Sequence, residues 1–216
     1  PYQAPPIRHA DIVDRIDYDA HLEIQCRPEA ALWRQGDGPY PVRFFHLGRL
    51  FPSPVKIYAV RDGTAREVRY SSRLFSFGKA DFAAALPDDM GFAGFRVMHS
   101  GTDERDWLAF LGASYFRSAG ELDQYGISAR GIAVDTALPT AEEFPHFSHF
   151  WLEPAADPRA VTIYALLEGP SLTGAYRMQA TRQERVIVDV EAVLFFRTAI
   201  RRLGVAPLTS MFWFSE

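Results

Sequence analysis

The clearest fold signal in the chain is the stretch Ile57-Tyr58-Ala59-Val60-Arg61-Asp62-Gly63-Thr64-Ala65-Arg66-Glu67-Val68-Arg69-Tyr70. Strand-forming residues lie on both sides of Asp62-Gly63, and aspartate and glycine both tolerate the positive φ that a tight hairpin turn requires. The stretch therefore predicts a β-hairpin, with one strand over residues 55–60 and the next over 67–70.

Short apolar and alternating runs of the same kind continue along the chain. They predict further strands over 42–47, 92–99, 107–118, 129–135, 147–153, 161–168, 174–180 and 185–196. Helical signals are confined to two short segments, 16–24 and 29–33. Because no helical blocks separate the strands, βαβ units are disfavoured. We predict an all-β fold, a large antiparallel β-sandwich with only short peripheral helices.

Composition narrows the class of protein. The 216 residues are 48% hydrophobic and 23% charged with a net charge of −4, which is typical of a globular domain or a part of one. The arginines are scattered, so a nucleic-acid partner is not expected. No apolar run reaches 18 residues, so no membrane-spanning helix is expected. Cys26 is the single cysteine, so cysteine usage does not indicate whether the protein works in an oxidising or a reducing compartment.

The two ends of the chain suggest that it is part of a longer protein. It opens at Pro1 without a methionine or a signal-peptide apolar region, so we expect the true N-terminus to lie upstream or to have been removed. Residues 206–214 are strongly apolar and aromatic, although the chain stops at Glu216. We expect further chain to cover this segment, and we expect the 216 residues alone to fold poorly.

Motifs for metal or nucleophilic chemistry are weak. His146 and His149 follow Glu142 and Glu143, but an i, i+3 histidine pair that binds zinc normally lies on a helix, and this one enters a strand. Ser114 lacks a G-x-S-x-G context and is interpreted as a strand residue. No phosphate-binding loop is recognised, and we predict neither a metal nor a cofactor.

Carboxylates suited to glycoside chemistry are present, but sequence cannot measure the separation that such a pair requires. The candidates Asp123, Asp135 and Glu153 are interpreted as turn, strand-end or surface residues.

A better candidate for binding is a stretch in which aromatic residues and arginines are mixed. Tyr115, Arg117, Tyr125 and Arg130 could point from neighbouring strands into one groove, with Gly120 and Gly126 turning the connecting loop. Such side chains stack on sugar rings and bond to hydroxyl groups. A purely structural network of tyrosines and arginines at strand ends explains the pattern equally well.

Longer stretches carry a family resemblance. The runs are Phe44-Phe45-His46-Leu47-Gly48, Leu111-Gly112-Ala113-Ser114-Tyr115-Phe116-Arg117, Tyr125-Gly126-Ile127-Ser128-Ala129-Arg130-Gly131, Glu142-Glu143-Phe144-Pro145, Tyr164-Ala165-Leu166-Leu167 and Leu203-Gly204-Val205-Ala206-Pro207-Leu208-Thr209-Ser210-Met211-Phe212. Together they resemble the periplasmic glucan-biosynthesis proteins of the OpgG/OpgD (MdoG/MdoD) family, in the same order from about residue 16 to 214.

The resemblance implies a fold and a location. It implies an exported periplasmic protein whose N-terminal domain is a galactose-mutarotase-like β-sandwich, followed by an immunoglobulin-like domain. Residues 1–216 would be the N-terminal portion of that sandwich. The immunoglobulin-like domain and the family's catalytic aspartates would lie beyond residue 216, so no catalytic residue is assigned within this chain.

The resemblance also implies an activity and partners. The intact protein would act on β-1,2-glucan as an inverting hydrolase or transglycosylase, with Tyr115, Arg117, Tyr125 and Arg130 in the groove. The alternative is a non-catalytic glucan-binding scaffold that works beside a membrane glucan synthase. Hydrolysis versus transfer, product length and the existence of a homodimer are left open.

Overall fold

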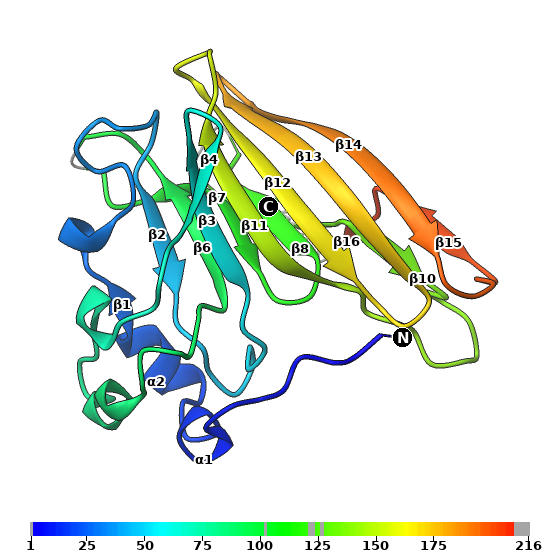
Figure 1. The fold of residues 1–216 in the computed structure, drawn as a ribbon, viewed down its shortest axis with the longest axis horizontal. Helices are drawn as coiled ribbons and strands as arrows, with labels where there is room; N and C mark the ends of the chain where they lie inside the picture. Colours follow the sequence, from blue (N-terminus) through cyan, green and yellow to red (C-terminus); the bar gives the residue numbers. More distant parts are fainter. Residues whose placement is uncertain (1, 102, 121–123, 126–127, 210–216) are drawn as a thin grey trace, which may run out of the picture.

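The fold is a two-layer β-sandwich with short helices at one end (Figure 1). The computed structural model describes residues 2–101, 103–120, 124–125 and 128–209. Two six-stranded sheets form the layers, and two two-stranded sheets flank them. The predicted all-β sandwich is confirmed.

The first sheet has the strand order β14-β13-β12-β11-β3-β4. Its strands, in chain order, are β3 (Lys56–Arg61), β4 (Thr64–Glu67), β11 (His146–Pro154), β12 (Ala160–Glu168), β13 (Leu172–Arg182) and β14 (Val186–Phe196). Neighbouring strands are antiparallel except for β3 and β11, which pair in parallel. The hairpin with Asp62-Gly63 forms one edge of this sheet, and the long strand β14 forms the other.

The second sheet is antiparallel throughout, in the order β16-β9-β8-β7-β6-β2. Its strands are β2 (Val42–Phe45), β6 (Gly94–Met98), β7 (Asp106–Leu111), β8 (Tyr115–Ser118), β9 (Ser128–Arg130) and β16 (Leu208–Thr209). The small sheets pair β1 (Gln25–Cys26) with β5 (Phe75–Ser76) and β10 (Ile132–Val134) with β15 (Leu203–Val205).

The helices are short and lie beside the β1–β2 end of the sandwich (Figure 1). They are α1 (Ala10–Val13), α2 (Tyr18–Glu23) and the 3-10 helices Pro28–Ala30, Ser72–Leu74 and Asp81–Ala85. Asp17 caps α2, because its side chain accepts a hydrogen bond from the Ala20 amide at 3.0 Å. The expected helix over 16–24 is thus present in a shorter form, and that over 29–33 is reduced to one 3-10 turn.

Aromatic side chains join the two sheets across the core. Phe95 and Phe110 of the second sheet stack with ring centroids 5.0 Å apart, and Phe150 of the first sheet meets both rings at 5.0 and 5.5 Å. All three side chains are at most 2% exposed. Edge-to-face pairs of this kind contribute about 0.5–1.5 kcal/mol each beyond burial, so this cluster helps to hold the two layers together.

One strand prediction needs correction in a way that shapes the site. The predicted strand over 107–118 is two strands, β7 and β8, joined by the turn Gly112-Ala113-Ser114. Gly112 and Ala113 both have positive φ, 75° and 42°. The interpretation of Ser114 as a strand residue was therefore wrong, because the apolar run continues through the turn and hides it. Ser114 is buried there, and its carbonyl accepts a hydrogen bond from the Gly131 amide.

Other boundaries differ by smaller amounts. Strand β4 starts directly after Gly63, because Arg61 and Thr64 already pair across a two-residue turn, so the predicted strand 67–70 began too late. The predicted strand 129–135 is divided at Gly131 into β9 and β10.

The aromatic C-terminal segment is described only in part. Of residues 206–214, Leu208–Thr209 form β16, and residues 210–214 lie outside the described part of the chain. Within the described part, no helix has the length and apolar character needed to cross a membrane.

Candidate functional site

Three of the four predicted groove residues lie on the outer face of the second sheet. Tyr115 and Arg117 alternate with the core residue Phe116 along β8, and Arg130 of β9 is paired with Tyr115. Because alternate residues of a strand face the same side, these three side chains point away from the core. Tyr125 lies in the connection between β8 and β9, whose residues 121–123 and 126–127, including Asp123 and Gly126, fall outside the described residues.

Arg117 and Tyr125 form the more accessible of two clusters. The Arg117 guanidinium carbon lies 4.5 Å from the centre of the Tyr125 ring, and Arg117 is exposed. The Tyr125 hydroxyl donates a hydrogen bond to the carboxylate of Asp106, and Arg96 approaches the same carboxylate at 3.9 Å. Burial, followed by the bond to Asp106, raises the pKa of Tyr125. Tyr125 is therefore protonated and fixed, and within the described residues no acceptor is hydrogen-bonded to the Arg117 guanidinium, whose donors suit a ligand rich in hydroxyl groups.

Arg130 is the centre of the second, buried cluster. Its guanidinium lies between the rings of Tyr115 and Phe144, at 5.3 and 5.0 Å, and it pairs with Glu142 at 2.6 Å. Thr136 donates to the same carboxylate at 2.7 Å. Burial tends to raise the pKa of Glu142, but the hydrogen bonds from Thr136 and Arg130 outweigh it, so the pKa is lowered. This cluster matches the structural alternative that the sequence left open.

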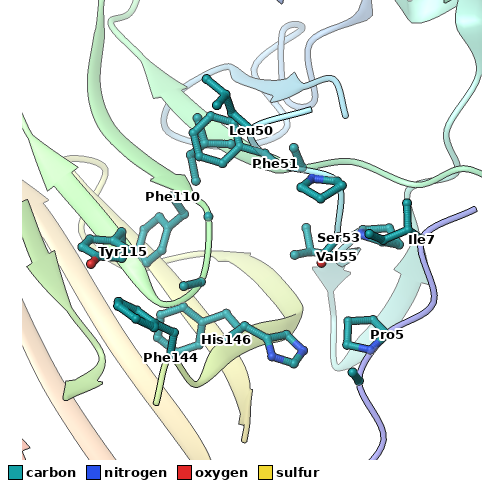
Figure 2. Close-up of a pocket in the computed structure, with 18 of the residues that line it drawn as sticks. Pro5, Ile7, Leu50, Phe51, Ser53, Val55, Phe110, Tyr115, Phe144 and His146 are labelled. Atoms are coloured by element: carbon teal, nitrogen blue, oxygen red, sulfur yellow. The ribbon is translucent and has the colours of Figure 1, made fainter. Parts of the chain in front are cut away.

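A cavity of about 460 Å³ lies at the end of the sandwich, next to Tyr115 (Figure 2). Figure 2 shows Tyr115, Phe110 and Phe144 on one side, Leu50 and Phe51 above, and Pro5 and Ile7 of the N-terminal segment opposite. The lining is mostly apolar and aromatic, with His146 as a polar group. Such a mixture of apolar surface and few polar groups is typical of ligand sites.

A shallower hollow of about 380 Å³ continues from this cavity along the outer face of the second sheet. The two hollows share Tyr115 and the β7–β8 turn, and the second reaches Arg117 and Ser128. The turn that divides β7 from β8 thus forms the border between the end cavity and the accessible arginine. The sequence did not reveal this border, because the turn lies inside the single strand predicted over 107–118. It did not reveal the partner of Tyr125 either, because Asp106 lies directly before that predicted strand.

The histidine pair has a geometry that the sequence did not predict. His146 and His149 are both in β11, and a register shift after Phe147 places them opposite Glu168 and Leu166, on one face of the first sheet. Burial lowers the pKa of both imidazoles. Within the described residues, no group of three or more histidine, cysteine or acidic side chains is arranged to hold a metal.

Two of the candidate carboxylates accept hydrogen bonds from other parts of the fold. Asp135 has a φ of 57° and accepts a hydrogen bond from the Arg202 amide at 2.9 Å, as expected of a turn residue. Glu153 accepts a hydrogen bond from the Tyr164 hydroxyl at 3.0 Å.

The fold and this surface together define a class, that of β-sandwich proteins with an arginine- and tyrosine-bearing outer sheet face beside a partly apolar end cavity. Comparison with known proteins narrows the class. The family model described as "Periplasmic glucan biosynthesis protein, MdoG" matches residues 1–216. The chain therefore belongs to the periplasmic glucan biosynthesis protein family.

Curated relatives agree with this assignment. Glucans biosynthesis protein D 2 of Ralstonia nicotianae is 47% identical over 100% of the chain and 42% of the relative. A probable glucans biosynthesis protein D of Shewanella oneidensis is 49% identical over 93% of the chain and 38% of the relative. Glucans biosynthesis protein G of R. nicotianae is 44% identical over 100% of the chain and 44% of the relative. The chain thus spans about two fifths of the length of these relatives.

Proposed function

We propose that the intact protein processes β-1,2-linked periplasmic glucan, as an inverting hydrolase or transglycosylase, in the periplasm. The observation that carries this proposal is the family match over the whole chain, whose description names periplasmic glucan biosynthesis. Residues 1–216 would supply the N-terminal portion of one sandwich domain. The remaining sandwich, an immunoglobulin-like domain and the catalytic aspartates would belong to the rest of the protein.

In an inverting reaction, one carboxylic acid protonates the oxygen of the leaving sugar while a carboxylate deprotonates water, or an acceptor hydroxyl, on the opposite face of the ring. The glycosidic C–O bond breaks as the new C–O bond forms at the same carbon. The described residues of this chain would take part in binding. Arg117 would donate to sugar hydroxyls, and Tyr115 would offer a ring at the border of the end cavity.

The four predicted groove residues have different parts in this proposal. Arg117 and Tyr115 would contact glucan, because both line the hollow on the outer sheet face. Tyr125 would hold Arg117 in position through their stacked contact. Arg130 would orient the rings of Tyr115 and Phe144 from its buried pair with Glu142.

The alternative is a scaffold that binds nascent glucan without cleaving it and passes it on from a membrane synthase. The outer-face arginines and aromatic rings support this alternative equally, because binding requires no acid/base pair. A homodimer would be compatible with either function.

Product analysis distinguishes the two functions. Protein from the intact gene is incubated with linear β-1,2-glucan, and the products are separated by chromatography and weighed by mass spectrometry. Shorter or cyclised products support the enzyme. Unchanged glucan that retards the protein in an affinity gel supports the scaffold, and unchanged glucan without retardation overturns both.

A further inference from the structure

Three aromatic rings lie together on the outer face of the first sheet, on the side of the sandwich opposite to Arg117. Tyr58 comes from β3, and His149 and Trp151 come from β11, where Trp151 is paired with Tyr58. The ring centroids are 5.3 Å apart for Tyr58 and Trp151, 5.8 Å for His149 and Trp151, and 6.4 Å for Tyr58 and His149. The planes differ by only 6–15°. We name these three residues the ring set.

The ring set is not part of the core. Its strand neighbours Ile57, Phe150 and Leu152 point inward and are at most 2% exposed, whereas all three rings are partly exposed. Partly exposed aromatic rings on a sheet surface offer apolar area on which a ligand can pack, and the polar atoms of Tyr58, His149 and Trp151 can bond to it. The pairing of β3 with β11 creates this surface, because it places Tyr58 beside Trp151.

A cavity of about 520 Å³ adjoins the ring set and shares His149 with it. Charged side chains of both signs line this cavity, namely Arg8, Lys56, Arg69, Glu67, Asp88 and Asp89. His146 also lines it, because the register shift in β11 turns both histidines to this face. Burial lowers the pKa of both imidazoles, with Lys56 adding to the effect at His149, so both rings are neutral at neutral pH.

The balance of charges in this cavity indicates the kind of ligand. Three cationic and three anionic side chains give no net field that would favour an ionic ligand, and Arg8 already pairs with Asp89 at 2.9 Å. A neutral ligand with many hydroxyl groups can use both donors and acceptors. The C–H faces of its sugar rings are apolar and can pack on aromatic rings.

We propose that the ring set and the adjoining cavity form a second saccharide-binding site, which holds a neutral glucan segment on the first sheet. The identity of the saccharide as glucan rests on the proposed function. The site is separate from Arg117, but the end cavity lies between them, sharing Pro5, Pro54, Val55 and His146 with the ring-set cavity and Tyr115 with the hollow beside Arg117. A long glucan could therefore occupy both sites and bind more tightly than a short one.

The test compares variants of the protein from the intact gene by calorimetric titration with linear β-1,2-gluco-oligosaccharides. Trp151→Ala is expected to raise Kd at least about tenfold, as for a central aromatic contact. Tyr58→Leu keeps an apolar side chain but removes the ring and is expected to raise Kd several-fold, and Trp151→Phe keeps a ring and is expected to stay within about threefold of the wild type. The matched control is Tyr18→Ala, which removes a 63% exposed ring on α2 and should leave Kd unchanged.

The outcomes separate this inference from the proposed function. If the wild type binds or processes glucan and both Trp151→Ala and Tyr58→Leu bind it with unchanged Kd, the second site is overturned and the proposed function stands. If the wild type neither binds nor processes glucan, the proposed function itself fails. Melting temperatures of each variant show whether it is folded, and if Trp151→Ala does not fold, Tyr58→Leu decides the question.

Discussion

Two histidines of this protein are surrounded by aromatic rings in opposite ways. His46 is 2% exposed, and the rings of Tyr70, Phe75 and Phe77 meet it edge-on at 67–88°. His149 is partly exposed, and its two neighbouring rings lie parallel to it. The edge-on rings help to enclose His46 in the core, whereas His149 and its parallel neighbours stay partly exposed to solvent. The same residue types thus build core in one place and a candidate binding surface in the other.

The two histidines also differ in how many hydrogen bonds their rings make. His46 uses both ring nitrogens, one toward the Leu47 carbonyl at 2.7 Å and one toward the Tyr70 hydroxyl at 2.8 Å. The first nitrogen donates and the second accepts from Tyr70, which describes a neutral imidazole. His149 has one described side-chain partner, the hydroxyl of Ser148 at 2.9 Å.

The clearest test of this difference between His46 and His149 is to remove each imidazole in turn. His46→Ala should lower the free energy of unfolding by about 3 kcal/mol, because it leaves a cavity and two unpaired polar groups. His149→Ala should lower it by less than about 1 kcal/mol, since the side chain is partly exposed. Urea unfolding followed by tryptophan fluorescence measures both, and equal losses would contradict the distinction.

Acid should affect the buried histidine in a defined pH window. Burial lowers the pKa of His46 from 6.5 to about 4. The unfolded chain therefore takes up a proton near pH 6.5, and the folded protein does so only near pH 4, so stability is lost as the pH falls through this window. The loss by pH 4 should approach about 3 kcal/mol. His46→Gln should remove this contribution, and an unchanged pH profile of that variant would contradict it.

Arg130 and Arg117 on the second sheet show the same contrast between a buried and an accessible side chain. The buried Arg130 is tested through its partner Glu142. Glu142→Gln should lower the free energy of unfolding by about 2 kcal/mol, less than for a fully buried pair because Glu142 is partly exposed. Glu142→Asp keeps the charge and should recover part of the loss. Thermal unfolding measures both, and a neutral effect of Glu142→Gln would show that Arg130 finds another partner.

Arg117→Ala should have the smallest effect on stability, less than about 0.5 kcal/mol, because the side chain is exposed and its contact with Tyr125 is a surface cation–π pair. It should weaken glucan binding several-fold if Arg117 lines the groove. Affinity electrophoresis in gels with and without β-1,2-glucan measures this change. If glucan retards the variant as much as the wild type, Arg117 is not part of the binding site.

Local sequence patterns predicted the strands and the general fold, but they did not reveal pairings between distant segments. The hairpin at Asp62-Gly63 was predictable because both residues favour its geometry. The turn at Ala113 was not, because alanine gives no signal for positive φ and the flanking residues are apolar. Nothing in residues 55–60 or 147–153 indicates that the two strands pair in parallel.

The sequence indicated which residue types form the candidate site, but it did not indicate which of them are buried and which are accessible. The mixture of tyrosine and arginine at 115–130 includes three residues that lie on one sheet face, and their part in binding stays a prediction. Sequence could not distinguish Arg117 from Arg130. The two arginines differ because Glu142 pairs with Arg130, whereas Asp106 bonds to Tyr125 beside Arg117. Both contacts form only after folding. The ring set was missed for the same reason, although Tyr58 and Trp151 each alternate with buried residues in a predicted strand.

The parallel pair of β3 and β11 joins segments that are far apart in the sequence. During synthesis, the β3–β4 hairpin emerges early, but its inner edge has no partner until β11 has left the ribosome. The strands β6 to β9 emerge in between and can pair with one another first. Sheet pairings between distant segments are slow to form, and unpaired edges are prone to aggregate. The chain order therefore allows the strands of one half of the sandwich to pair before the inner edge of β3 has its partner, and until then that edge is open to other strands.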